Sequence, residues 1–231
     1  VAKLGKKVNL TVDAYSIKVK DRIVLTGLFD TNDDQIGAIL QSLNVGAAQF
    51  FTNAVDTKTN GVDVIATYND KLGQGKLNLT LAANFNEMKV EAIHTTAQLA
   101  GKEEVYFGVR ERYFLLASAP KHKINLSLDY SVNRFNLFAR VTRFSGVKLI
   151  DFNFDEANPD VYESRHTLDL TLGFKVSDNF NIAIGGVNIL DTYPSIQDPG
   201  LTETGGMWDA VQMGHGGAFF FGKLVYRLKT K

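Results

Sequence analysis

The feature that most constrains this chain is a strict alternation of apolar and polar side chains over long segments. In residues 76–85, apolar side chains occupy every second position from Leu77 to Phe85, and mainly polar side chains lie between them. Residues 122–132 and 167–176 repeat the pattern. Successive side chains of a β-strand point to opposite faces, whereas a helix repeats every 3.6 residues. These segments are therefore predicted to be strands with one apolar face.

Weaker copies of the same pattern fill most of the remaining chain. The composition agrees with a β-rich fold, because glycine (20 residues) and aromatic residues (11%) are frequent and proline (4 residues) is rare. We therefore expect an all-β chain with about eight strands. The expected strands lie near residues 7–24, 48–68, 76–92, 120–132, 135–150, 165–176, 179–193 and 217–229.

The connections between the expected strands alternate in length. The short ones are residues 69–75, 133–134 and 177–178, and the long ones are about 25–47, 93–120, 151–164 and 194–216. The short ones carry the polar and glycine residues typical of hairpins. Transmembrane β-barrels place short turns on the periplasmic side and long loops on the extracellular side. The predicted fold is an antiparallel transmembrane β-barrel segment of about eight strands, with short periplasmic turns and long extracellular loops.

Alternation alone does not decide whether the apolar face meets lipid or a dry core, because a soluble β-barrel has the same period. Several expected strands exceed the five or six residues usual in soluble sheets and approach the length that crosses a bilayer at a tilt. The opposite face is consistently polar, as a water-filled lumen requires. No apolar run reaches the ~18 residues of a membrane helix, and the mean hydropathy is -0.08. These observations favour the membrane barrel.

Charge and cysteine content exclude several classes of protein. The chain has 25 Lys and Arg against 25 Asp and Glu, so we expect no nucleic-acid binding. It has no cysteine, which excludes disulfides and thiolate metal sites. The histidines, His94, His122, His166 and His215, are scattered, and no catalytic or metal-binding motif is found. We therefore expect neither enzymatic activity nor a cofactor.

Five segments, taken in order, give the chain a resemblance to a known family. The most specific is residues 178–194, DNFNIAIGGVNILDTYP, which is similar to the "GxxNLfDxxP" element of TonB-dependent outer-membrane receptors. The other segments are residues 13–24, 53–63, 119–128 and 142–147. The resemblance covers most of the chain, because these segments are distributed from residue 13 to residue 194, and it is to the carboxy-terminal β-barrel portion of a Bacteroidetes-type TonB-dependent receptor. The chain departs from the usual aromatic carboxy terminus, because it ends in Leu-Lys-Thr-Lys.

The resemblance implies a location in the cell outer membrane and contact with outer-membrane lipid. Complete receptors of this family have a 22-stranded barrel around an amino-terminal plug, preceded by a short box that engages TonB. Neither is recognisable here, so residues 1–231 are expected to be the carboxy-terminal part of such a barrel. The plug domain and TonB box would be absent. The TonB complex would then act through the missing amino-terminal region.

The function that the resemblance implies is TonB-dependent uptake of a scarce solute, above all a ferric siderophore. Haem, cobalamin and glycans are the competing solutes. The residues themselves leave two other functions open. One is a complete small eight-stranded outer-membrane barrel with a structural or adhesive role, and the other is a soluble ligand-binding β-barrel.

One long loop carries side chains suited to holding a small-molecule ligand such as an iron chelate. It contains Tyr106, Phe107, Arg110 and Arg112. Aromatic rings and guanidinium groups together fit an anionic chelate or a sugar. The alternative role of this cluster is packing between loops.

The last long loop adds two further candidates. Trp208 is the only tryptophan of the chain, and it is suited either to stacking on a ligand or to anchoring the loop. His215 lies in the glycine-rich residues 214–217, which are expected to form a flexible approach to the last strand and a possible ligand contact.

Other residues are assigned structural roles. Gly185 and Gly186 suit close approach of the backbone or barrel curvature. Asn188 and Asp191 are expected to shape the turn at the mouth of their strand through hydrogen bonds to the backbone. Arg140, on the polar face, would point toward the plug of a complete receptor.

Two further expectations concern the acidic loop and the sheet edges. Residues 151–156, with Asp160, lack the spacing of a calcium loop and are expected to be solvated. A segment of a larger barrel leaves two open edges, which are prone to aggregation. We therefore expect the isolated segment to close on itself or to pair with another copy.

Overall fold

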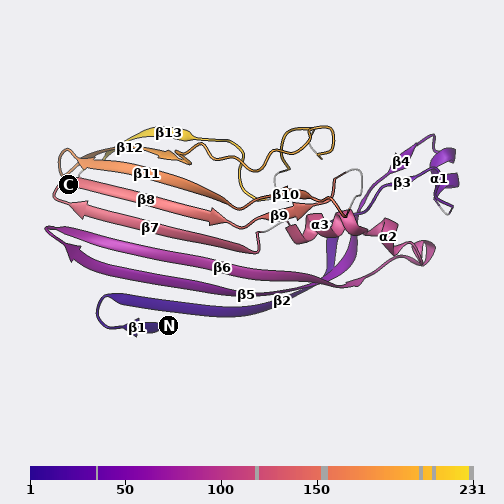
Figure 1. The fold of residues 1–231 in the computed structure, drawn as a ribbon, viewed down its shortest axis with the longest axis horizontal. Coiled ribbons are helices and arrows are strands. Elements are labelled where there is room, and N and C mark those ends of the chain that lie inside the picture. The colour runs from indigo at the N-terminus through magenta and orange to yellow at the C-terminus, as the bar shows by residue number, and fades with distance from the viewer. Residues whose placement is uncertain (35, 118–119, 152–155, 203–204, 210–211, 229–231) are drawn as a thin grey trace.

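A computed structural model gives the fold and describes residues 1–34, 36–117, 120–151, 156–202, 205–209 and 212–228. Within these residues, nine strands form one antiparallel sheet in which each strand lies beside the next sheet strand of the sequence (Figure 1). In order, they are β1 (Ala2–Leu4), β2 (Val8–Leu25), β5 (Phe51–Leu72), β6 (Gly75–Ile93), β7 (His122–Val132), β8 (Phe135–Phe144), β11 (Arg165–Lys175), β12 (Phe180–Val187) and β13 (Phe219–Tyr226).

Each predicted strand corresponds to one strand of this sheet, and the short β1 is an addition. Two predicted strands are too long. β12 ends at Val187 because Asn188 has a φ of 50°, a left-handed conformation that cannot continue a strand. β8 ends at Phe144, and the chain then leaves the sheet to form β9 (Val147–Leu149), which pairs with β10 (Asp160–Tyr162) in a separate hairpin.

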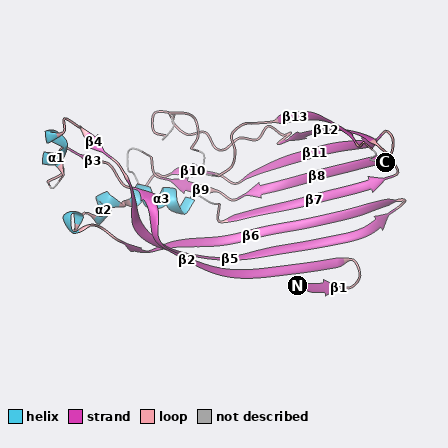
Figure 2. Cartoon of the chain, turned by 180° about the vertical axis from the view of Figure 1, so that it is seen from behind, coloured by secondary structure: helices cyan, strands magenta, loops and turns pink. Residues whose placement is uncertain are grey.

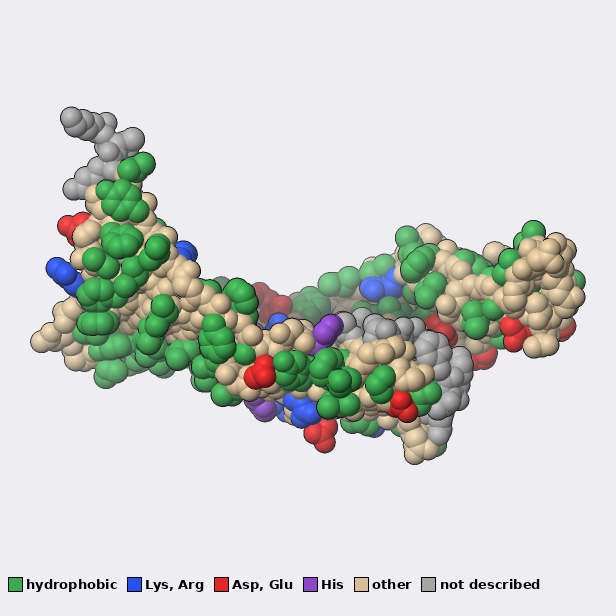
Figure 3. Space-filling view, turned by 90° about the horizontal axis from the view of Figure 1, so that it is seen from above, with side chains coloured by type: hydrophobic (Ala, Val, Ile, Leu, Met, Phe, Trp, Pro, Cys, Tyr) green, Lys and Arg blue, Asp and Glu red, His purple; other side chains and the backbone are tan. Residues whose placement is uncertain are grey.

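One face of the sheet is apolar across six strands. The register aligns Leu10, Ala66, Leu81, Leu126, Val141 and Leu168 in a single cross-strand row. The side chains of this row are not packed into a dry core, because Leu126 and Val141 remain 51% and 43% exposed. Hydrophobic side chains also cover much of the strand half of the surface in Figure 3. Such a surface is the lipid-facing wall of a membrane barrel.

The opposite face carries polar side chains at the alternating positions. The neighbouring row consists of Asn9, Thr67, Thr80, Ser127, Arg140 and Asp169. Asp169 of this row, and Thr142 one position further along the same face, are buried, at 6% and 5% exposure. Thr142 donates a hydrogen bond of 2.8 Å to the Asn125 side-chain oxygen. The predicted division into an apolar outer and a polar inner face is therefore confirmed.

Short and long connections lie at opposite ends of the sheet (Figure 1). Tight turns at one end are formed by residues 5–7, 73–74, 133–134 and 176–179. The long loops at the other end contain β3 (Phe29–Asp30), α1 (Gly37–Ser42), β4 (Ala47–Ala48), η1 (Ala97–Leu99), α2 (Glu103–Tyr106), α3 (Val109–Ala117) and the β9–β10 hairpin. This layout confirms the predicted alternation of short turns and long loops, which in a transmembrane β-barrel belong to the periplasmic and the extracellular side. Among the described residues, no helix has the length and apolar character needed to cross a bilayer.

The sheet is open, with β1 and β13 at its two edges in the described part of the chain (Figure 2). The prediction that the segment closes on itself is therefore wrong, whereas pairing with another copy stays a prediction. The physical reason is curvature. Barrel diameter grows with strand number, so strands shaped for a wide barrel curve gently and a few of them span only an arc.

Glycine on the polar face makes room for an aromatic ring. Tyr15 of β2 lies directly opposite Gly61 of β5, and a Cβ added to Gly61 would lie 2.3 Å from the Tyr15 ring. It would also lie 2.8 Å from the Phe85 carbonyl oxygen of β6. The Tyr15 hydroxyl accepts a hydrogen bond of 3.1 Å from the Asn84 side chain, which fixes the ring above the glycine.

We expect Gly61→Val to destabilise the sheet by about 1–3 kcal/mol, because the added side chain displaces the Tyr15 ring. Thermal unfolding of the protein in detergent, followed by circular dichroism, measures the effect. Gly222→Val in β13 is the matched control, because a Cβ there meets no atom within 4 Å. Equal losses of stability in the two variants would contradict the proposed role of Gly61.

Candidate ligand-binding site

The long loops form a packed layer above the sheet. One buried cluster joins strand ends to the loops between β2 and β5 and between β6 and β7; its members are Val24, Phe29, Ala54, Val55, Leu99, Tyr106 and Phe107. A second cluster consists of Ala117, Val147, Leu149 and Tyr162, with Phe114 and Trp208 packed against it. Because α3 contributes Phe114 and the last loop contributes Trp208, the two loops predicted to bind a ligand meet at this second cluster.

Tyr106 and Phe107 lie inside the loop layer, 2% and 1% exposed. The Tyr106 hydroxyl shares a hydrogen bond of 2.7 Å with the Thr52 hydroxyl, and its ring meets the edge of Phe50 at 6.2 Å. The Tyr106 carbonyl accepts a hydrogen bond from the backbone N–H of Gly27. Tyr106 thus fastens α2 to the loop between β2 and β5, which is the packing role considered for this cluster.

Arg110 and Arg112 both lie near the amino-terminal end of α3. Arg110 is buried, and its guanidinium lies over the Phe114 ring at 4.9 Å. Arg112 donates hydrogen bonds to the Phe107 carbonyl and, at 2.7 Å, to the Glu104 carboxylate. Phe107 and Arg110 also border a cleft of about 380 Å³, although both side chains are almost fully buried.

The structure brings Trp208 and His215 together in a stack of three rings. Tyr193 stacks on Trp208 at 5.3 Å and an interplanar angle of 11°, and Trp208 stacks on His215 at 6.0 Å and 26°. The Trp208 indole N–H donates to the Pro194 carbonyl at 3.2 Å. A hydrogen bond to the Asp191 carboxylate raises the pKa of the Tyr193 phenol.

A groove of about 490 Å³ borders this stack. Arg165 forms one part of its lining and donates to the Tyr193 carbonyl at 3.0 Å and to the Ser195 hydroxyl at 2.9 Å. Glu163 pairs with the same guanidinium at 3.3 Å. Aromatic rings beside a hydrogen-bonding floor are suited to a planar or cyclic solute. Sequence reasoning missed Tyr193 and Arg165 as site residues, although Tyr193 lies in the "GxxNLfDxxP"-like segment.

Asn188 and Asp191 have the structural roles predicted for them. Both adopt positive φ angles, 50° and 53°. The Asn188 side chain donates to the Thr192 carbonyl at 2.8 Å and accepts from the Thr192 N–H at 3.1 Å. The Asp191 carboxylate accepts from the Ala218 N–H at 2.8 Å, which joins the two ends of the last loop. Gly217, with a φ of 68°, packs against Asp191 and Tyr193, so the glycine-rich approach to β13 is part of this turn.

Gly185 and Gly186 permit the close approach expected of them, because a Cβ added to Gly185 would lie 2.8 Å from Phe221 and one added to Gly186 would lie 2.8 Å from Phe220.

Arg140 lies on the polar face, where a residue of the neighbouring strand β11 binds it. Its guanidinium donates to the Asp169 carboxylate at 2.6 and 2.9 Å. The other oxygen of Asp169 accepts from the backbone N–H of Asn188 at 2.9 Å.

The acidic loop lies largely outside the described residues, because positions 152–155 belong to the part left out. Of its neighbours, Asp160 has its pKa raised by burial and by the nearby Asp151. Elsewhere in the described residues, the potential ligand atoms of Asp21, Asp56 and His94 lie within 4.8 Å of one another. Hydrogen bonds of the Asp56 carboxylate to His94 and to the Asp21 N–H account for this grouping.

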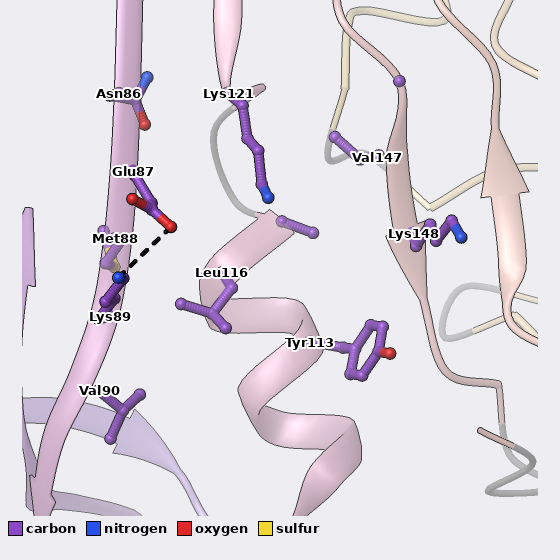
Figure 4. A pocket seen from close by; sticks show the side chains of 12 residues that line it. Asn86, Glu87, Met88, Lys89, Val90, Tyr113, Leu116, Lys121, Val147 and Lys148 are labelled. Carbon is purple, nitrogen blue, oxygen red and sulfur yellow. Dashed lines mark ion pairs between the residues drawn. The ribbon is translucent and has the colours of Figure 1, made fainter. Parts of the chain in front are cut away.

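A further cleft at the loop end lies where β6 and β7 separate. β7 pairs with β6 only as far as Phe85, and α3 contacts both the free edge of β6 and β9. The cleft between them has a volume of about 760 Å³. In Figure 4, Leu116 points from α3 toward β6, Tyr113 points toward β9, and Lys121 extends into the space above the helix.

Comparison with models of known protein families identifies the family of this chain. The family model described as "TonB dependent receptor-like, beta-barrel" matches residues 2–189. The chain belongs to the TonB-dependent receptors. It is therefore an outer-membrane protein of a family of receptors and transporters rather than of enzymes, and the soluble-barrel alternative is excluded. No curated protein matches the sequence.

Solved structures show the same fold. The outer membrane transporter YddB from Escherichia coli has a TM-score of 0.62 and 14% identity, over 97% of this chain and 31% of that one. The ferric-catecholate import receptor Fiu from E. coli K12 has a TM-score of 0.53 and 15% identity, over 97% and 26%. The pyoverdine receptor FpvA from Pseudomonas aeruginosa PAO1 has a TM-score of 0.56 and 9% identity, over 96% and 27%. The chain thus spans less than a third of the length of these structures.

Proposed function

We propose that this chain is the carboxy-terminal part of a barrel that imports a scarce solute, and that the solute is a ferric siderophore. The observation that carries the proposal is the pairing of an outer-membrane barrel wall with a loop layer that presents aromatic rings and arginines. The names of Fiu and FpvA, an import receptor for ferric catecholates and a receptor for pyoverdine, support this class of solute. Transport itself would require a plug and the TonB complex, engaged through an amino-terminal region.

The groove beside the Tyr193–Trp208–His215 stack is the proposed capture site. Tyr193, Trp208 and Arg165 line it, and their rings and guanidinium would suit the aromatic and anionic parts of an iron chelate. Phe107 and Arg110 would contribute a second contact through their own cleft, with Arg112 beside it. Tyr106 would act by holding these side chains in place.

Trp208→Ala is expected to raise the Kd for a bound ferric siderophore about 10- to 30-fold, because a central tryptophan commonly contributes about 2 kcal/mol. The measurement is equilibrium binding of a ferric catecholate and a ferric hydroxamate to the protein in detergent. Phe135→Ala is the control, because this exposed ring lies at the turn end. An unchanged Kd for the Trp208 variant would place the capture site elsewhere. Failure of the unmodified protein to bind either chelate would reject this solute class.

A further inference from the structure

A row of three lysines crosses the outer face of the sheet. The register pairs Lys18 of β2 with Lys58 of β5, and Lys58 with Lys89 of β6. Side chains directly opposite one another in neighbouring antiparallel strands have Cβ atoms only about 5 Å apart. Like charges in such positions are destabilising. A row of this kind therefore calls for an anion that compensates it.

The lysine row lies on the same face as the apolar wall. From Leu10 to Lys18 in β2, and from Ala66 to Lys58 in β5, the pairing continues without a bulge. Alternation is therefore unbroken, and the three lysines point to the lipid side. The irregularities in the pairing come only beyond the row, after Val19 and at Asp56.

The height of the row matches the edge of a membrane. Along β6, the apolar side chains of this face run from Leu77 to Phe85. Lys89 follows four residues later, about 13 Å further along the strand toward the extracellular loops. An apolar band about 25 Å tall is followed by headgroups on each side. Long lysine side chains at this level reach the headgroup layer.

The acidic neighbours compensate the row only in part. Lys18 pairs with Glu91 at 3.3 Å, and Lys89 pairs with Glu87 at 3.7 Å. The central Lys58 is half-buried, and within the described residues it makes no ion pair. It is the ammonium group best placed to receive an anion from the membrane.

The row continues into the cleft between β6 and α3. Lys89 lines this cleft together with Glu87, Lys121 and Lys148, and Leu116 and Val147 contribute apolar side chains to it. In Figure 4, Lys121 extends toward α3, whereas Lys148 points away from the helix. The lining has three lysines, one carboxylate and several apolar side chains, so a cleft of this kind at the level of the headgroups suits a molecule that has both phosphate and acyl chains.

We propose that Lys18, Lys58 and Lys89 bind the phosphate groups of anionic lipids in the outer leaflet, and that the adjacent cleft receives part of the same lipid. A lipid is the occupant that this position favours, because the lysine row lies on the same face as the apolar wall, with only the row of Ser16, Asn60 and Glu87 between them. The inference rests on the outer-membrane location and is independent of the transported solute.

The test measures binding of lipid A, a diphosphorylated lipid, to the protein in neutral detergent micelles by native mass spectrometry. Lys58→Gln is expected to weaken binding about 5-fold, and the triple variant of Lys18, Lys58 and Lys89 to glutamine about 100-fold. The control is the double variant of Lys71 and Lys76 to glutamine, because these lysines also pair across β5 and β6 but on the polar face at the turn end.

Three results would overturn the proposal. The first is unchanged lipid A binding by the triple variant when its melting temperature matches that of the parent protein. The second is an equal loss of binding in the Lys71 and Lys76 control, which would indicate a general charge effect. The third is displacement of lipid A by equimolar inorganic phosphate, which would indicate a site for free anions. A loss confined to the row variants, and resistant to phosphate, supports the proposal.

Discussion

Replacing Tyr106 with alanine is expected to lower the free energy of unfolding of the loop layer by about 3–5 kcal/mol. The side chain is almost fully buried, so its removal leaves a cavity in the cluster that joins α2 to the ends of β2 and β5. It also removes the hydrogen bond to Thr52, which leaves that hydroxyl without this partner. Limited proteolysis of the protein in detergent, together with its melting curve, measures the loss.

A second substitution separates packing from ligand contact. Tyr106→Phe keeps the ring and loses only the hydroxyl, so a loss of about 1 kcal/mol is expected. If Tyr106 acts only through packing, solute affinity in this variant stays that of the parent. A large loss of solute affinity with an unchanged melting curve would show that the hydroxyl contacts the solute directly. Tyr226→Ala is the control, because this ring is exposed at the turn end of β13.

The strands were predictable because their signal is local. Alternation with a period of two depends only on neighbouring residues, and the register then places Leu81, Leu126 and Val141 on one face. The sequence itself contains the signal that shortens the predicted strand at residues 179–193. Asn188 and Asp191 are among the residue types that tolerate positive φ, and Asn188 ends the strand.

The candidate site was less predictable because it depends on contacts between distant segments. Trp208 and His215 stand out as single residues, but their stack with Tyr193 depends on a loop whose ends are joined by Asp191 and Ala218. Burial was also invisible in the sequence. The cluster at residues 106–112 looks like a ligand-binding loop, yet the packing of α2 and α3 turns Tyr106 inward.

Asp169→Ala is expected to lower the free energy of unfolding by about 2–3 kcal/mol, which is the second large effect that we expect. A single carboxylate serves two elements here, because it pairs with Arg140 of β8 and accepts the backbone N–H of Asn188. Removing one partner of a buried ion pair leaves the other charge uncompensated, which costs 3–5 kcal/mol when both are buried. Arg140 is 44% exposed, so solvent screens its charge and lowers the expected cost.

Two further variants divide this cost between the ion pair and the turn. Asp169→Asn keeps a side-chain oxygen for the Asn188 N–H and loses the ion pair, so it should retain more stability than Asp169→Ala. The double variant Arg140→Leu and Asp169→Leu leaves no uncompensated charge, so the remaining loss of stability comes from the missing hydrogen bond to the Asn188 N–H. A double-mutant cycle in detergent gives the coupling between the two side chains, and a coupling near zero would contradict the proposed pair.

The turn gives Asp169 an effect beyond stability. Asn188 positions Thr192, and the same turn leads to Tyr193 and its stack with Trp208. Loss of the Asp169 acceptor should therefore weaken solute binding at the groove, although Asp169 lies on the polar face of the sheet and not in the groove. Asp169→Asn, which preserves the acceptor, should bind the ferric siderophore better than Asp169→Ala. Equal affinity in the two variants would mean that the carboxylate supports the barrel wall alone and that the last loop holds its shape without it.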